Sequence, residues 1–267
     1  MHHIPTARRP RALDDVPGWF QPVDQDLFGV LIEATGPEPG DLAEMGCYLG
    51  QSAILMGRHL GPGDVLTVCD LFGDETHGSY SRRGTLAYYR KRLTRDAFEA
   101  NYLAFHEELP RIVHGRTVEL AEELAAKSCR FVHIDASHQY EDVSGDIDIA
   151  RRALRPHGIV ALDDYRTEHV PGVAAAVWEA VFTKGLRPVC VSPAKLYATW
   201  GDPGPFQRAL RGWAAERTDR TVGEDTIDGG TVLRIAPSKL PPPRGARRVA
   251  QELLPPVVLR AVSKALP

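Results

Sequence analysis

The chain has 267 residues, of which 43% are hydrophobic and 25% charged, as is ordinary for a globular protein. A formal net charge of -3 provides no global positive field for nucleic acid, and no apolar run is long enough to span a bilayer. The 4 cysteines lack a paired or metal-ligand spacing, and no apolar segment of a signal peptide follows the first arginines, so we expect a cytoplasmic protein.

The N-terminal segment, residues 1–22, is rich in proline and arginine. We expect an extended arm that is ordered against a partner subunit or over the active site. Apolar residues at helical spacing then predict a helix over 24–35, which Gly36 and Pro37 end.

The segment Leu-Ala-Glu-Met-Gly-Cys-Tyr-Leu-Gly-Gln-Ser (42–52) predicts a buried strand that turns sharply into a helix. Gly46 and Gly50 let the backbone approach a ligand without an intervening Cβ atom. A dinucleotide fingerprint would require glycine where Tyr48 and Gln51 stand, so this spacing argues against NAD(P). An ordinary tight turn between a strand and a helix is the alternative interpretation.

The next apolar run, 65–70, predicts a second parallel strand that ends in Asp70. A carboxylate at this position commonly accepts hydrogen bonds from ribose hydroxyls, whereas the alternative is a solvated side chain. The polar segment 72–83 predicts a loop over the ligand cleft, and 86–109 predicts one or two surface helices. A short third strand is expected at 112–113.

The rest of the core repeats the alternation of strand and helix. Gly115 and Arg116 follow the third strand, at the position of an adenine ring in such a fold. The further elements that we predict are a helix over 118–126, a strand over 131–135, a helix over 140–154, a turn at 155–158, a strand over 159–164, a helix over 172–182 and a hairpin of strands 189–191 and 195–200.

This order predicts an α/β fold with a doubly wound, mostly parallel, seven-stranded sheet and helices on both faces. The catalytic domain would span 23–200, and 201–267 would form a C-terminal extension with a helix over 206–216 and one more strand at 231–235. The last 30 residues carry six basic residues and one acidic residue, a local charge of +5. We expect the arm or this extension to mediate a homo-oligomer.

Carboxylates stand at the ends of several predicted strands, where open parallel sheets bind ligands. Asp70, Asp135, Asp163 and Asp164 would repel one another unless cations, protons or hydroxyl groups lie between them. Hard oxygen ligands of this kind suit magnesium.

Two segments resemble those of a known family. Phe-Val-His-Ile-Asp-Ala-Ser-His-Gln-Tyr-Glu (131–141) and Val-Ala-Leu-Asp-Asp-Tyr (160–165) are similar to the corresponding motifs of small-molecule O-methyltransferases. The Glu-x-Gly-x-x-x-Gly turn resembles the first motif of class I S-adenosylmethionine-dependent methyltransferases. The resemblance covers roughly residues 40 to 200, and the sugar O-methyltransferases of the macrocin and novobiocin type are the most similar group.

The resemblance implies S-adenosylmethionine as the cofactor and a hydroxyl group of a small, glycosylated or polyhydroxylated metabolite as the acceptor. The residues that it implies for cofactor binding are Glu44, Gly46, Tyr48, Gly50, Ser52, Asp70, Gly115, Arg116 and Asp135. Asp135, Asp163 and Asp164 match the positions that hold a divalent metal. Ala136-Ser137-His138 departs from the family's segment, so a metal-free histidine mechanism competes with one that uses magnesium.

A hydroxyl group needs a base or a metal ion to remove its proton. His138 is the first candidate base, together with the strand-end Asp135, and His169 is the second candidate. The alternative role of His138 is structural, as a helix cap or a partner of a carboxylate. His133 alternates with apolar strand residues, which favours a core histidine. The competing functions are an NAD(P)-linked oxidoreductase and a nucleoside-binding module without catalysis.

Overall fold

The computed structural model describes residues 9–74 and 93–238. The expected lid loop at 72–83 and the helices at 86–109 fall partly outside these residues, and the basic tail from 239 onward falls wholly outside. Among the described helices, none is both long and apolar enough to cross a membrane.

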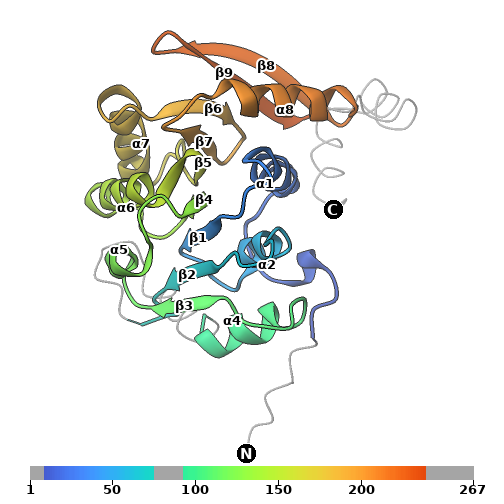
Figure 1. Ribbon diagram of the computed structural model, residues 1–267, viewed down its shortest axis with the longest axis vertical. Coiled ribbons are helices and arrows are strands. Elements are labelled where there is room, and N and C mark those ends of the chain that lie inside the picture. The colour runs from blue at the N-terminus through green and yellow to red at the C-terminus, as the bar shows by residue number, and fades with distance from the viewer. Residues whose placement is uncertain (1–8, 75–92, 239–267) are drawn as a thin grey trace, which may run out of the picture.

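In the described part of the chain, nine strands form one sheet in the order β3-β2-β1-β4-β5-β7-β6-β9-β8 (Figure 1). Their bounds are β1 Asp41–Met45, β2 Leu66–Asp70, β3 Arg111–His114, β4 Cys129–Ile134, β5 Leu154–Leu162, β6 Arg187–Val191, β7 Leu196–Thr199, β8 Arg220–Ile227 and β9 Gly230–Pro237. The first five strands pair in parallel, whereas β7 is antiparallel to both β5 and β6. The expected α/β class is confirmed, but the sheet has nine strands and not seven.

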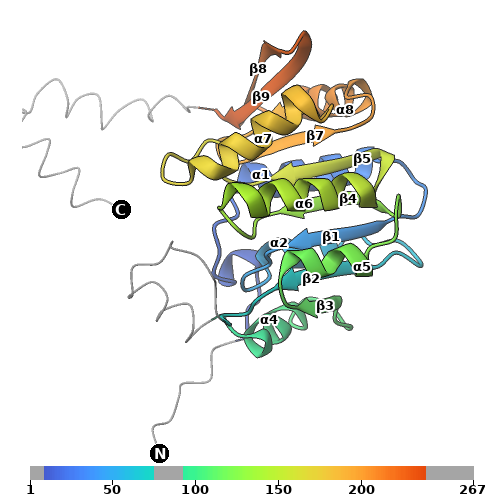
Figure 2. The same cartoon turned by 90° about the vertical axis from the view of Figure 1, so that its left-hand side faces the viewer.

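Helices cover both faces of the sheet. Their bounds are η1 Leu13–Asp15, α1 Pro22–Ala34, α2 Gln51–Gly57, α4 Arg95–Tyr102, η2 Thr117–Glu119, α5 Leu120–Glu123, α6 Tyr140–Ala153, α7 Pro171–Thr183 and α8 Gly204–Ala215. α1, α2, α4 and α8 lie on one face, and α5, α6 and α7 lie on the other, the face turned to the viewer in Figure 2. Each face has its own cluster of buried apolar side chains, as expected for a sheet between two helical layers.

Strand β4 lies inside the sheet, between β1 and β5, and all its residues are buried. Phe131 packs with the α1 and α2 layer, whereas Val132 and Ile134 pack with the α6 and α7 layer. This alternation between two apolar layers explains why the strand is a nearly continuous apolar run. His133 is two residues after Phe131, so its imidazole points to the same face of the sheet and lies in the interior.

The described part of the N-terminal arm packs against the same molecule. Leu13, Val16 and Phe20 are buried in the cluster formed with α1 and α2. The side-chain amide of Gln51 donates to the backbone carbonyl of Leu13. Residues 9–21 therefore fold onto the protein's own core, close to the turn that follows β1.

Three local predictions were wrong. The segment 155–158 was expected to be a turn because of its Arg-Pro-His-Gly sequence, but it continues β5 through a register shift against β4. The helix expected over 118–126 is divided into η2 and the short α5. Strand β8 was not expected; its mostly exposed, polar side chains give no apolar alternation, and its pairing with β9 extends the sheet.

The carboxyl ends of β1, β2, β4 and β5 meet at one edge of the sheet. Met45 pairs with Ile134, and Ile134 pairs with Leu162. Because β7 runs in the opposite direction, its first residue, Leu196, pairs with Leu162. Lys195, which directly precedes β7, is therefore placed at the same edge as the strand-end carboxylates.

Candidate active site

The turn between β1 and α2 needs glycine for conformational reasons. Gly46 and Gly50 have φ values of 80° and 96°, in the left-handed region that side chains disfavour. A Cβ atom on Gly46 would lie 2.1 Å from the backbone oxygen of Asp135. The turn after β1 is therefore packed directly against the backbone that follows β4, and it brings the two candidate segments together.

Asp70 holds this turn in place. Its Oδ2 accepts hydrogen bonds from the backbone N–H groups of Cys47 and Tyr48, each at 2.9 Å, and its Oδ1 accepts from Phe72 at 2.8 Å. Burial raises the pKa of Asp70, although these three hydrogen bonds favour the ionised form. A carboxylate has further lone pairs, so the same side chain can still accept from ribose hydroxyls.

Glu44 is buried beneath the turn. Its Oε1 accepts from the hydroxyl of Ser52 and lies 2.7 Å from Nδ1 of His133. Its Oε2 is also buried and has no hydrogen-bond partner among the described residues. Burial raises the pKa of Glu44 to about 7. An unpaired buried oxygen is costly, so Oε2 is suited to a cationic ligand group.

His133 joins Glu44 to Lys195 in the interior. The Nζ atom of Lys195 lies 3.0 Å from Nε2 of His133. An ammonium can only donate, so Nε2 accepts and Nδ1 donates to Glu44. Burial, reinforced by the ammonium of Lys195, holds the pKa of His133 well below its usual range. His133 is thus the buried, paired histidine that the strand pattern indicates.

Lys195 also contacts both strand-end carboxylates. Its Nζ lies 2.6 Å from Oδ2 of Asp163 and 3.8 Å from Oδ2 of Asp135, and its side chain is only 2% exposed. Burial disfavours the ammonium, but the two carboxylates outweigh this effect and raise the pKa of Lys195. Burial likewise opposes ionisation of Asp163, but Lys195 holds the pKa of that carboxyl below its ordinary value.

His138 pairs with Asp164 at the rim of the site. Its Nε2 lies 3.2 Å from Oδ2 of Asp164, and the two side chains are 34% and 31% exposed. The hydroxyl of Thr167 donates to Oδ1 of Asp164 at 2.7 Å. Asp164 has a φ value of 54°, which is unusual for a residue with a side chain. The hydrogen bond from His138 is the main cause of a lowered pKa at Asp164, so this carboxylate stays ionised.

The His138 and Asp164 pair and the Asp135 and Asp163 pair line one small cavity between the ends of β4 and β5. Its volume is about 10 Å³, enough for one water molecule or one hydroxyl group. Five apolar side chains complete the lining, so only part of the cavity wall is polar, and His138 is its one imidazole. An imidazole paired with a carboxylate can take a proton from a hydroxyl group placed beside it.

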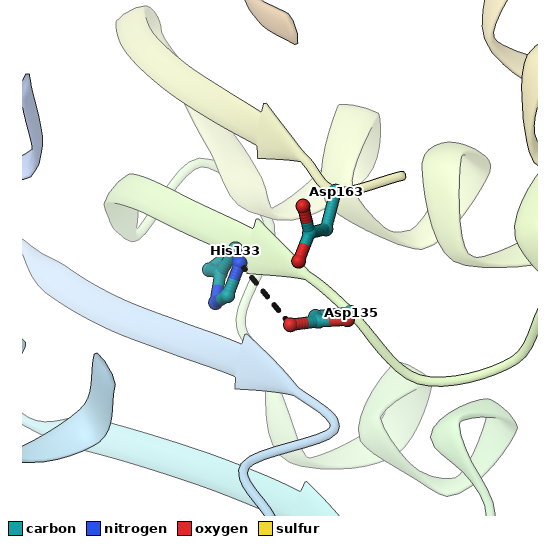
Figure 3. A group of neighbouring side chains, drawn as sticks. All are labelled: His133, Asp135 and Asp163. Carbon is teal, nitrogen blue, oxygen red and sulfur yellow. Dashed lines mark ion pairs between the residues drawn. The ribbon is translucent and has the colours of Figure 1, made fainter. Parts of the chain in front are cut away.

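The metal ligands expected from the sequence are not arranged around one vacant centre. Asp164 is engaged by His138 and Thr167, while Oδ1 of Asp163 accepts from the backbone N–H of Asp164 at 2.9 Å. The ligand atoms that do converge belong to His133, Asp135 and Asp163, within 4.8 Å of one another (Figure 3). Lys195 Nζ contacts all three residues, so this donor set fits an ammonium and does not fit a second cation beside it.

Other predicted residues lie farther from this cluster. His169 is exposed and does not line the cavity. Arg116 pairs with Asp142 at 3.4 Å and is largely exposed. Gly115 lies beside β2, where its backbone N–H donates to the carbonyl of Asp70 at 3.1 Å. Of the two histidines considered as bases, only His138 is placed with the carboxylates.

Lys195 is the site residue that sequence reasoning missed. It was assigned to the start of a strand, with no role. Its sequence signal would have been a lysine at the amino end of the strand that pairs antiparallel with the strand before Asp163. That signal depends on the direction of β7, which a single sequence does not reveal.

Comparison with protein-family models gives a match over part of the chain. Residues 43–165 match a protein-family model described as a methyltransferase domain. No curated protein sequence matches the chain.

Solved structures share the fold at low sequence identity. The O-methyltransferase NovP is 18% identical, with a TM-score of 0.50 over 67% of this chain and 81% of that one. CalS11, a TDP-rhamnose 3'-O-methyltransferase of calicheamicin biosynthesis, is 19% identical, with a TM-score of 0.45 over 68% and 82%. TomG from Streptomyces achromogenes, in complex with S-adenosylmethionine, is 17% identical, with a TM-score of 0.37 over 82% and 79%. The likeness to NovP confirms the Rossmann-like methyltransferase fold.

Proposed function

We propose that the protein transfers a methyl group from S-adenosylmethionine to a hydroxyl of a small metabolite, because residues 43–165 match a family model described as a methyltransferase domain. The observation that carries the proposal is the pairing of His138 with Asp164, at 3.2 Å, on the cavity lined by Asp135. A pair of this kind provides a base where a hydroxyl group is to be deprotonated.

The chemistry follows from the tautomer of His138. In the proposed tautomer Nε2–H donates to the ionised Asp164, and Nδ1 is the nitrogen that takes the proton once the acceptor is bound. The acceptor oxygen attacks the methyl carbon of the sulfonium, so that a C–O bond forms while the C–S bond breaks. The hydroxyl proton passes to Nδ1, and the electron pair of the broken bond remains on sulfur in S-adenosylhomocysteine. Asp164 orients the ring and stabilises the imidazolium.

On the cofactor side, the proposed contacts are made by Glu44, Gly46, Tyr48, Gly50, Ser52, Asp70, Gly115, Arg116 and Asp135. The buried Oε2 of Glu44, which lacks a partner among the described side chains, is suited to the cofactor's ammonium group. Asp70 is proposed to accept from the ribose. Burial and the neighbouring Asp163 raise the pKa of Asp135, and the positive charge of the cofactor's sulfonium is proposed to favour its ionised form.

The N-terminal arm is proposed to help shape the acceptor pocket. Trp19 is 72% exposed, although tryptophan is usually well buried. Its ring lies 5.2 Å from the ring of Tyr48, in the turn after β1. An exposed indole beside the cofactor turn offers a flat apolar surface for the ring of an acceptor.

The proposal is tested with S-adenosylmethionine that carries a ¹³C-labelled methyl group. The protein is incubated with a panel of phenolic and polyhydroxylated compounds, and carbon NMR follows the label. We expect an O-methyl resonance and the release of S-adenosylhomocysteine. Calorimetric titrations with S-adenosylhomocysteine and NADH provide the comparison with an oxidoreductase. Binding of NADH alone contradicts the proposal, and binding of S-adenosylhomocysteine without transfer to any acceptor favours the non-catalytic binding module.

Cofactor affinity is expected to depend on pH through Glu44. The pKa of Glu44 in the free protein is raised to about 7, and a cationic group binds the ionised form. The affinity for S-adenosylhomocysteine should therefore fall as the pH drops below 7, by roughly tenfold between pH 8 and pH 6. Calorimetry at several pH values measures this change. The Glu44→Gln variant should lose the pH dependence, and an unchanged dependence in that variant would show that another group is responsible.

A further inference from the structure

We propose that Lys195 provides, from within the chain, the positive charge that a divalent metal would provide between Asp135 and Asp163, so that methyl transfer by this protein needs no metal ion. The inference rests on the proposed function, because it concerns the same site. It makes Lys195 a positioning residue, one that fixes the two carboxylates without touching the acceptor.

The ammonium contacts the one group of three possible ligand atoms that lie within 4.8 Å of one another among the described residues. It is 2.6 Å from Asp163, 3.0 Å from His133 and 3.8 Å from Asp135. Magnesium requires oxygen ligands at about 2.0–2.1 Å, in place of the ammonium rather than next to it. Lys195 and a divalent ion therefore compete for one position.

The two carboxylates and the ammonium of Lys195 stabilise one another. Two neighbouring carboxylates repel each other unless a cation or a shared proton lies between them; burial and Asp163 raise the pKa of Asp135, and the ammonium of Lys195 opposes this shift. A buried ammonium is equally costly unless it is paired and hydrogen-bonded. Lys195 is 2% exposed and reaches both carboxylates, so these two costs offset one another within the protein.

The backbone around Lys195 keeps the ammonium in place. The hydroxyl of Ser192 accepts from the backbone N–H of Lys195 at 2.8 Å, and the N–H of Ser192 donates to the carbonyl of Lys195 at 2.8 Å. The ring of Phe20 lies over the ammonium, 5.9 Å from Nζ. Because the turn before β7 is closed by these bonds, the side chain is held in the interior and is not a surface lysine that could move aside for a metal.

The test measures binding of manganese(II) by electron paramagnetic resonance, which requires no turnover. The samples are the wild-type protein, Lys195→Met and, as a matched control, Lys184→Met, which removes a lysine paired with Asp148 at 3.0 Å. Methyl transfer is measured in parallel with and without EDTA. S-adenosylhomocysteine binding and circular dichroism report whether each variant is folded.

We expect the wild type and Lys184→Met to bind no manganese below ~1 mM and the wild type to keep its full rate in EDTA. Lys195→Met should bind one manganese ion at least ~10-fold more tightly than the wild type, because a unit charge has left the donor set. Adding Asp163→Asn to that variant should abolish the new site. A folded Lys195→Met protein that binds no manganese overturns the proposal.

If Lys195→Met does not fold, measurements on the wild-type protein test the proposal. Stoichiometric manganese binding by the wild type that Asp163→Asn removes, or a rate that EDTA abolishes, overturns the proposal; the absence of both supports it. A protein that transfers no methyl group to any acceptor contradicts the proposed function instead. The manganese measurement still gives its result in that case, so the two failures are distinguishable.

Discussion

Replacement of His138 by alanine is expected to lower the kcat of methyl transfer by ~10²–10⁴, the usual contribution of a positioned general base. The imidazole lies 3.2 Å from Asp164 and lines the cavity between β4 and β5, so its removal leaves no base at this position. Binding of S-adenosylhomocysteine should be nearly unchanged, since Glu44 and the turn after β1 are untouched. Stopped-flow or discontinuous product assays give the rate, and calorimetry gives the affinity.

Two further variants make this result specific. Asp164→Asn keeps the shape of the side chain but removes the charge that orients the imidazole, and it should also lower kcat strongly. His169→Ala removes an exposed histidine outside the cavity and should change the rate by no more than ~2-fold. A His138→Ala protein with the wild-type rate, or a large loss in His169→Ala, would mean that the wrong histidine has been identified.

Gly46→Ala is expected to weaken cofactor binding strongly. The added Cβ atom would lie 2.1 Å from the backbone oxygen of Asp135 and 2.7 Å from Cα of Ala136, so the ends of β1 and β4 must separate. Overpacking costs about 1–3 kcal/mol, and the left-handed backbone, with φ at 80°, adds about 1–2 kcal/mol. A displacement near 1 Å at such a site lowers binding or catalysis by ~10²-fold. Urea denaturation and calorimetry with S-adenosylhomocysteine measure the two effects.

Gly63→Ala is the matched control. Gly63 also has a left-handed backbone, with φ at 87°, but a Cβ atom there would meet no atom within 4 Å. This variant should therefore show the conformational cost alone and retain cofactor affinity. Equal losses of stability and affinity in the two variants would contradict the close packing of the glycine turn against the segment that follows β4.

The core of the fold could be predicted because its strands are buried on both faces. Continuous apolar runs such as 65–70 and 131–135, separated by helical patterns, leave few alternatives to a doubly wound sheet. β8 was missed for the opposite reason: it lies at the end of the sheet, and most of its side chains are exposed. The Arg-Pro-His-Gly segment was assigned to a turn because proline and glycine favour turns, but pairing with β4 overrides that local preference.

The site residues that could be predicted are those that directly follow a predicted strand. Asp135, His138, Asp163 and Asp164 directly follow two adjacent parallel strands, and the structure brings them to one cavity. Partners from distant segments could not be predicted. Lys195 reaches Asp163 only because β7 is antiparallel to β5, and Glu44 reaches His133 only because β1 and β4 are neighbours.

A crystal structure with bound S-adenosylhomocysteine and an acceptor analogue would examine the geometry of transfer most directly. We predict that the homocysteine portion lies against the turn of Gly46 to Gly50, with its ammonium at Glu44, and that the acceptor oxygen lies between the sulfur atom and Nδ1 of His138. A nucleoside bound elsewhere on the protein, or an acceptor oxygen out of reach of His138, would contradict methyl transfer at this edge of the sheet.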